Sequence, residues 1–238
     1  MFKQMLAEKA SIADVSLSPK QLEQLTIYYE RLIERNKVVN LTALTSPEDV
    51  AVKHMIDSFL VYRQDYFSPG ASLCDVGTGA GFPGLALKIY RPDLQVTLMD
   101  SLAKRLAFLQ ELIDELGLAG VQVCHLRAED AGRSPVHREK YDVVTARAVA
   151  RLSVLVEYAL PLVKTGGYFV AMKGPKYEEE IVDAKQALQK LNGQLEMVVP
   201  AVLPGLDDGR AILYIKKMSP CSSAYPRRAG IPEKNPLA

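Results

Sequence analysis

The chain has 238 residues, of which 48% are hydrophobic, and a formal net charge of +1. This length and apolar content suit one large α/β domain with an appendage, so the chain is not short of core. The N-terminus is charged and no apolar run approaches the ~20 residues of a membrane span, which excludes a signal peptide and a bilayer protein; we expect a cytoplasmic protein.

Residues 1–70 are expected to form a helical extension packed on the main domain. Ser18-Pro19-Lys20-Gln21 combines a capping-box pattern with proline at the first helical position, and apolar residues then recur at helical spacing. A second helix should run from 46 to about 62. In it, His54 and Asp57 share one face because they are three residues apart. Asp57 could orient His54 towards a pocket, although a polar pair at the surface or between domains is the commoner reason for this spacing.

A glycine-rich turn joins a short buried strand to a helix within residues 71–84, as in a nucleotide pocket at the carboxyl end of a strand. Residues 79–84 match the dinucleotide pattern G-x-G-x-x-G, and residues 75–81 match the acidic-x-G-x-G-x-G pattern of S-adenosylmethionine enzymes. The dinucleotide pattern should begin directly after the strand, yet two residues intervene before Gly79. In the methyl-donor interpretation Asp75 lies near the methionine part of the cofactor. Three glycines make room for the cofactor, namely Gly77, Gly79 and Gly81.

Strands and helices alternate from residue 71, which predicts a parallel sheet covered on both faces. Strands are expected at 71–76, 94–100, 121–126, 141–146 and 167–172, with helices at 83–90, 102–116, 151–163 and 176–191. Two strands, 194–202 and 210–216, then follow without room for a helix. Five parallel strands and a terminal hairpin make the core, 71–217, a seven-stranded, mostly parallel sheet of the class I S-adenosylmethionine-dependent methyltransferase type. A dinucleotide domain would continue the alternation, so this change of rhythm favours the methyl donor.

Two further features concern ligands. Asp100 closes the second strand and can accept hydrogen bonds from the ribose hydroxyls of either cofactor, so it does not discriminate between them. Cys74, Cys124 and Cys221 lack the spacing of metal ligands, so we expect no metal site. Cys74 and Cys124 lie in predicted strands, which favours reduced thiols in the core at these two positions.

Basic residues gather at the end of the chain. Residues 210–238 contain six lysines and arginines, with Glu233 as their single acidic residue. We expect residues 218–238 to form a basic tail, and a basic tail on a neutral body favours a polyanionic partner.

Many short motifs, each of modest specificity, become specific when they occur together. They lie at 40–42, 54–58, 75–84, 100–105, 108–109, 127–129, 146–150, 161–162, 166–167, 173–174 and 225–237. In this combination, which covers nearly everything from about residue 18, the chain resembles the bacterial 16S ribosomal RNA guanine-N7 methyltransferases, also called the glucose-inhibited division protein B family. One departure is 219–224, where the family would be more basic.

The resemblance implies methyl transfer from S-adenosylmethionine to N7 of one guanine of 16S ribosomal RNA, near the decoding centre of the small ribosomal subunit. It places cofactor contacts at Gly77, Phe82, Asp100, Ser101, Leu102, Ala128, Glu129 and Arg147. Nothing in it requires a partner chain, so we expect a monomer.

Guanine N7 carries a lone pair and no proton, so its methylation needs alignment of the reacting atoms and no general base. Arg147 and Lys173 are the residues expected to take part in catalysis by holding guanine O6 or a neighbouring phosphate. For Arg147, the alternative is a strand-end arginine that pairs with a carboxylate of the core domain. Seven basic residues are candidate contacts to the RNA backbone, although any one such residue is more often a solvated surface charge. They are Lys104, Arg105, Lys173, Lys176, Arg210, Arg227 and Arg228.

Three other functions remain open at this point. A methyltransferase of the same fold could act on a small molecule or a protein, and an RNA- or ribosome-binding module could keep the cofactor pocket without activity. A nicotinamide-dependent oxidoreductase is supported by the formal glycine pattern alone.

Overall fold

A seven-stranded sheet organises the computed structural model, which describes residues 1–237. Across the sheet the strands are β3 (Val121–His125), β2 (Gln95–Asp100), β1 (Ser72–Val76), β4 (Tyr141–Arg147), β5 (Val163–Lys173), β7 (Ala211–Lys217) and β6 (Gly193–Pro200). Neighbouring strands are parallel except that β7 runs antiparallel to both β5 and β6. This confirms the predicted seven-stranded, mostly parallel sheet.

The strand order reverses between β1 and β4. Strands β2 and β3 lie on one side of β1, whereas β4 and β5 continue on the other side. In open α/β sheets such a switch point leaves a crevice at the carboxyl ends of the strands, because the connections leave in opposite directions. The topology therefore places any ligand at the ends of β1, β2 and β4.

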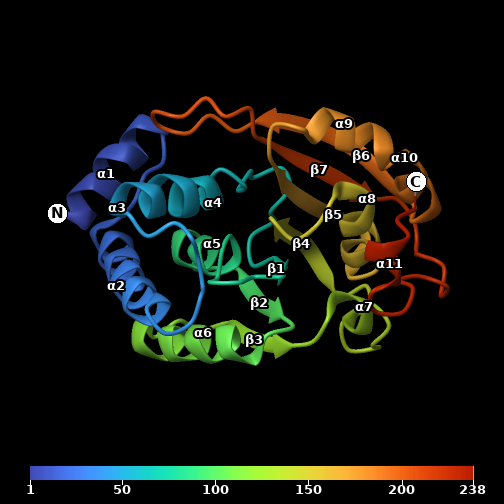
Figure 1. Cartoon of the computed structure of the whole chain (residues 1–238), viewed down its shortest axis with the longest axis horizontal. Coiled ribbons are helices and arrows are strands. Elements are labelled where there is room, and N and C mark those ends of the chain that lie inside the picture. The colour runs from blue at the N-terminus through green and yellow to red at the C-terminus, as the bar shows by residue number, and fades with distance from the viewer. Residues whose placement is uncertain (238) are drawn as a thin grey trace.

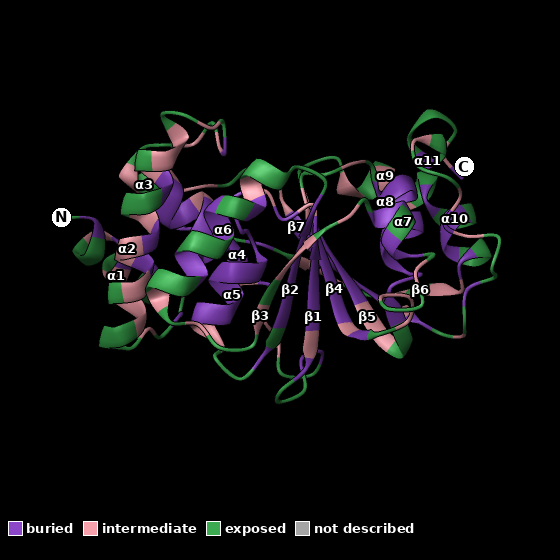
Figure 2. Cartoon of the chain, turned by 90° about the horizontal axis from the view of Figure 1, so that it is seen from below, coloured by how far each residue is buried: buried purple, intermediate pink, exposed green. Residues whose placement is uncertain are grey.

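Helices cover both faces of the sheet (Figures 1 and 2). One face carries α5 (Gly84–Tyr90) and α6 (Ala103–Leu116). The other carries α7 (Ala128–Ala131), α8 (Leu152–Ala159), α9 (Tyr177–Asp183) and α10 (Lys185–Lys190), with α11 (Ile231–Lys234) beside α8. Each face has its own cluster of buried apolar side chains, which is why the central strands are apolar on both sides.

The N-terminal helices extend the layer of α5 and α6 (Figure 1). They are α1 (Phe2–Ile12), α2 (Pro19–Asn36), α3 (Pro47–Asp49), the seven-residue π-helix η1 (Val50–Ile56) and α4 (Asp57–Phe59). The predicted capping box of α2 is present, with Ser18 accepting from the backbone of Gln21 and the Gln21 side chain accepting from Ser18. Leu6 and Leu25 join the same core cluster as Leu73 of β1, so one core runs across residue 70.

Several predicted bounds differ from the structure for local reasons. Helix α8 ends at Ala159 because Pro161 follows two residues later, and proline has no backbone N–H to continue the helical hydrogen bonds. The predicted helix 176–191 is two helices joined at Ala184. Strand β5 begins at Val163, four residues before the prediction, through an irregular register against β4. The helix at α1 was not predicted, although Phe2, Leu6 and Ala10 recur at four-residue spacing.

Residues 218–237 lie against the face that carries α8 and α10, and Cys221 and Leu237 are buried in its core. Residue 238 of the predicted tail lies outside the described residues. The division into 1–70, 71–217 and 218–238 stays a prediction. Within residues 1–237, no helix combines the length and apolar character needed to cross a bilayer.

Candidate functional site

The loop after β1 is held by Asp75, which is completely buried. Its Oδ2 accepts hydrogen bonds from the hydroxyl of Thr78 at 2.6 Å and from the backbone N–H of Gly84 at 3.0 Å, and its Oδ1 accepts from the hydroxyl of Thr145 at 3.0 Å. Burial raises the pKa of Asp75 to about 6, against the opposing effect of these hydrogen bonds. Asp75 lines neither cavity described below and holds the loop in place, so its contact with the cofactor stays a prediction.

The three glycines of this loop have different neighbours. Gly77 and Gly79 line a cavity, as predicted. Gly81 does not: with φ of +100°, it leaves room for the hydroxyl of Tyr28 and for Leu109, which a Cβ atom would meet. Tyr28 comes from α2 and donates to the carbonyl of Ala80. In the structure Gly81 makes room for an N-terminal helix, and its role in accommodating the cofactor stays a prediction.

A cavity of about 300 Å³ lies at the ends of β1 and β2. Asp100 forms part of its wall, and the backbone N–H groups of Gly79 and Leu102 each donate to one of its carboxylate oxygens at 2.9 Å. Ser101 also lines the cavity, whereas the exposed side chain of Leu102 does not. We call this space the small cavity.

The opposite wall of the small cavity combines α7, α8 and the end of the chain. Ala128 and Glu129, both predicted, lie beside Tyr158, Gly230 and Glu233, which the sequence analysis missed. Glu129 is 5% exposed and accepts a hydrogen bond from the N–H of Gly230 at 2.9 Å. Burial raises the pKa of Tyr158 to about 12, and the nearby carboxylates of Glu129 and Glu233 add to the shift.

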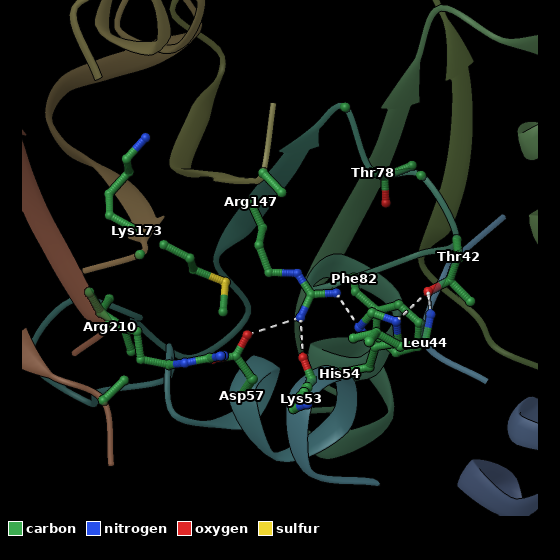
Figure 3. Close-up of a pocket in the computed structure, with 18 of the residues that line it drawn as sticks. Thr42, Leu44, Lys53, His54, Asp57, Thr78, Phe82, Arg147, Lys173 and Arg210 are labelled. Atoms are coloured by element: carbon green, nitrogen blue, oxygen red, sulfur yellow. Dashed lines mark hydrogen bonds and ion pairs between the residues drawn. The ribbon is translucent and has the colours of Figure 1, made fainter. Parts of the chain in front are cut away.

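A second space of about 590 Å³, which we call the large cavity, is lined by the residues shown in Figure 3 and adjoins the small one. The two share three lining residues, Gly77, Arg105 and Ala148. Segments far apart in the chain meet here, including the loop at 41–44, the helix around His54, the ends of β4 and β5, and the start of β7. Its basic lining residues are Lys53, Arg105, Arg147, Lys173 and Arg210.

Arg147, at the end of β4, links the sheet to the N-terminal helices (Figure 3). Its Nη1 donates to the carbonyl of Lys53 at 2.9 Å and to Oδ2 of Asp57 at 3.0 Å, and its Nη2 donates to Nδ1 of His54 at 2.9 Å. The alternative of an arginine paired with a carboxylate is thus what the geometry shows, although the carboxylate belongs to the N-terminal extension. Arg147 lines the large cavity and not the small one.

His54 is a neutral, buried imidazole. A guanidinium can only donate, so Nδ1 of His54 must be unprotonated, and Nε2 donates to the hydroxyl oxygen of Thr42 at 2.8 Å. Burial, aided by the charge of Arg147, lowers the pKa of His54 to about 3. Arg147 bonds to both His54 and Asp57 and mediates between them, so the pair lies in a contact between the N-terminal helices and the sheet, as the commoner explanation of this spacing has it.

Asp57 holds two arginines together. Its Oδ2 accepts from Arg147, and its Oδ1 accepts from Nη1 of Arg210 at 3.0 Å. Asp57 is buried, with 4% of the residue exposed. Arg210 also pairs with Asp208. Residues 53, 54 and 57 all belong to the segment where η1 gives way to α4, so the wide turn of a π-helix sets the spacing of these three groups.

Two other predicted residues lie at the border of the large cavity. The ammonium of Lys173 donates to the carbonyl of Ala150 at 2.9 Å and pairs with Glu180 at 2.6 Å. Phe82 stacks between the rings of Tyr28 and His54, with centroid distances of 5.0 and 4.6 Å. Both are therefore fixed in place by partners from other elements.

The remaining predicted RNA contacts differ in their surroundings. Lys104, Lys176 and Arg228 are exposed and line neither cavity. Arg105 lines both cavities and lies 3.4 Å from Asp100. Arg227 pairs with the buried Glu157 at 2.6 Å. Among residues 1–237, no group of three or more His, Cys, Asp or Glu side chains could hold a metal ion.

Comparison with known proteins agrees with this geometry. Residues 21–204 match the GidB family model, described as rRNA small subunit methyltransferase G. The chain belongs to this family. The Lactobacillus helveticus member is 52% identical over 223 residues, covering 93% of each chain, and the Lactobacillus delbrueckii subsp. bulgaricus member is 48% identical over 239 residues, covering 100% of each. Both are named ribosomal RNA small subunit methyltransferase G.

Solved structures support the fold of this GidB family member. A SAM-dependent methyltransferase from Aquifex aeolicus superposes with a TM-score of 0.52 at 19% identity, covering 71% of this chain and 93% of that one. The class I methyltransferase fold predicted from the strand rhythm is thereby confirmed, and so is the family resemblance predicted from the motifs.

Proposed function

We propose that the protein transfers a methyl group from S-adenosylmethionine to N7 of one guanine of 16S ribosomal RNA near the decoding centre. The observation that carries this proposal is the pair of adjoining cavities at the switch point of a methyltransferase sheet, in a chain of the GidB family. The two cavities meet at Gly77, so a ligand in one can present a reactive group to a ligand in the other.

The small cavity fits the adenosine part of the cofactor. Asp100 is fixed by two backbone donors and keeps lone pairs for ribose hydroxyls, while Ala128 and Glu129 face it across the cavity. Gly77 lines both cavities, and a Cβ atom there would lie 2.6 Å from a side-chain carbon of Val149. Its φ of +66° is one that residues with a side chain rarely adopt, so this border between the cavities favours glycine. When bound, the cofactor supplies an electrophilic sulfonium methyl group; Gly77 and Gly79 would hold its methionine part at this border.

The large cavity fits a guanine and the phosphates beside it. Arg147, Lys173 and Arg210 offer donors for guanine O6 or phosphate oxygens at the ends of three strands. N7 gains positive charge during the reaction, so an unpaired cation pointing at it would oppose the transition state. Asp57 offsets the charges of Arg147 and Arg210 through its two oxygens, which lets them position the base at a smaller electrostatic cost.

No side chain in this site has to remove a proton. His54, the histidine nearest the large cavity's arginines, is held neutral with Nδ1 bound to Arg147, so it orients rather than titrates. Alignment of N7 with the methyl group is therefore the main contribution expected from the protein. We expect it to act as a monomer in the cytoplasm, without a metal.

Methyl transfer to unmodified RNA tests the proposal. Tritiated S-adenosylmethionine is offered to small ribosomal subunits and to naked 16S RNA that lack the modification, and N7-methylguanine is mapped by borohydride reduction and aniline cleavage. Incorporation at one guanine is expected. If the cofactor product binds while neither RNA form is methylated, a small-molecule methyltransferase or a non-catalytic RNA-binding module replaces the proposal.

A further inference from the structure

The wall of the small cavity includes the last helix of the chain. Gly230, just before α11, and Glu233 within it line the same space as Asp100 and Ala128, although more than a hundred residues separate them in sequence. The N–H of Gly230 donates to Oε1 of Glu129 at 2.9 Å. This bond fixes the orientation of a buried carboxylate that faces the cavity, so the position of the tail decides where that carboxylate lies.

A buried ion pair fastens this segment to the core. The backbone N–H and Nε of Arg227 donate to Oε1 of Glu157 at 2.7 and 2.9 Å, and Nη2 donates to Oε2 at 2.6 Å. Glu157 has no exposed side-chain surface, and it precedes Tyr158, which lines the cavity. A buried carboxylate needs such a partner, because an uncompensated charge in the interior is strongly unfavourable.

Two further contacts seat the segment. Arg138 donates to the carbonyls of Tyr225 and Cys221, each at 2.7 Å. Pro226 lies directly on Gly132, where a Cβ atom would approach its Cγ to 2.8 Å. The φ of −64° at Gly132 suits any residue, so its lack of a side chain matters for contact with the tail and not for the backbone.

We propose that residues 225–234 form a fixed wall of the adenosine site and that Arg227 is a positioning residue for the cofactor. The segment is built into the core by a buried ion pair, backbone hydrogen bonds and close packing, whereas an RNA-binding arm needs its cations available to phosphates. A preformed wall removes the cost of ordering that segment when the ligand binds, which raises affinity. This inference rests on the proposed function for the identity of the ligand as an adenosine.

Binding of S-adenosylhomocysteine, measured by isothermal titration calorimetry on the full chain, tests it with a matched pair. Arg227→Met and Arg228→Met remove the same charge from adjacent residues, and Arg228 is exposed. We expect Arg227→Met to raise Kd at least about tenfold, with Arg228→Met within about twofold of wild type. Gly132→Ala leaves every charge in place and displaces Pro226 instead, so it should also raise Kd several-fold without leaving an unpaired buried carboxylate.

Kinetics separate this role from a general loss of stability or an RNA-binding role. In folded Arg227→Met or Gly132→Ala protein, KM for S-adenosylmethionine should rise while KM for RNA stays unchanged. If both arginine variants instead raise KM for RNA alone, the tail is an RNA arm. Unchanged affinity for S-adenosylhomocysteine in both Arg227→Met and Gly132→Ala would overturn the inference.

Hydrogen exchange on the wild type adds a measurement that depends on no variant. S-adenosylhomocysteine should slow exchange of the amides at 227–231 and 233, beyond any change in the exposed helix α9. An unchanged rate at these tail amides would contradict the inference. If wild-type protein does not bind S-adenosylhomocysteine at all, the proposed function fails first, and that result is distinguishable because it appears without any substitution.

Discussion

The small and large cavities adjoin, yet they carry opposite balances of charge. The small cavity is lined by three carboxylates, Asp100, Glu129 and Glu233, and two arginines, whereas the large one has five lysines and arginines against Asp57 and Asp208. Carboxylates suit the hydroxyl and amine donors of a nucleoside, and cations suit the phosphates of a nucleic acid. The difference indicates which ligand belongs on which side.

The two cavities are also built differently. Most of the small cavity comes from strand ends and the residues that follow them, so short local motifs specify it. The large cavity joins the N-terminal helices η1 and α4 to the ends of β4, β5 and β7. Two ion pairs of Asp57, at the start of α4, span 90 residues to Arg147 and 153 residues to Arg210. Cofactor binding should therefore respond to changes at the strand ends, and RNA methylation to changes in the ion-pair network.

The largest effect is expected at Arg147. Arg147→Lys keeps the charge but cannot reach Lys53, Asp57 and His54 at once, because an ammonium lacks the planar fork of a guanidinium. We expect kcat for methylation of 16S RNA to fall about 100-fold or more, with Kd for S-adenosylhomocysteine within about threefold of wild type. Arg151→Lys, at an exposed arginine outside both cavities, should change neither quantity.

A smaller effect, on cofactor binding in the small cavity, is expected at Asp100. Asp100→Asn replaces one carboxylate oxygen with an amide NH2 group. This donor would face the N–H of Gly79 or Leu102, which is also a donor, and the ribose would lose an acceptor. Kd for S-adenosylhomocysteine should rise about 30-fold while Kd for RNA stays unchanged. The exposed Asp114→Asn on α6 serves as the control. Equal losses of cofactor and RNA affinity would contradict the assignment of the cofactor to the small cavity and of RNA to the large one.

This difference in construction also explains what the sequence could predict. Asp100 ends a strand, and Ser101, Ala128 and Glu129 come soon after one, so all four line the small cavity at positions that visible apolar runs predict. Tyr158, Gly230 and Glu233 were missed, since no local pattern shows that α8 and the tail meet there. The tail's basic composition suggested RNA, and it could not reveal that Arg227 faces a buried glutamate.

The large cavity shows the same limit. The spacing of His54 and Asp57 indicated a shared helix face, but only the three-dimensional arrangement supplies the arginine between them. Asp75 and Gly81 fitted a cofactor pattern by position, and in the structure they hold the loop and accommodate Tyr28. A motif therefore locates a site well, while the assignment of each residue to ligand or scaffold depends on contacts from distant segments.

A moderate effect on RNA binding is expected at Arg210. Arg210→Gln removes a cation from the large cavity, while Asp57 keeps its bond to Arg147. Kd for 16S RNA should rise about fivefold at low salt, and the slope of log Kd against log salt should become shallower by about 1 if the guanidinium contacts a phosphate. Lys190→Gln, on α10 and outside both cavities, loses the same charge. If the slope of log Kd against log salt changes as much in Lys190→Gln as in Arg210→Gln, Arg210 makes no specific contact with a phosphate.

The last effect is on stability rather than on activity, and it concerns pH and the buried His54. Its pKa is about 3 in the folded protein against 6.5 for a free histidine, so its contribution to stability is complete above pH 6.5 and is lost as pH falls towards 3. The free energy of unfolding of wild type, minus that of His54→Gln, should fall by about 2 kcal/mol between pH 7 and pH 5.

Comparison with this variant isolates the histidine. Asp75, with its pKa raised to about 6 from 3.8, contributes in the opposite direction, because its stabilising effect is complete below pH 3.8 and is lost as pH rises through 6; it is present in both proteins and cancels. Urea unfolding at a series of pH values provides the measurement. A difference that stays constant from pH 7 to pH 5 would mean that the folded state accepts the proton on His54, which requires its bond from Arg147 to break and would reopen a proton-transfer role in the large cavity.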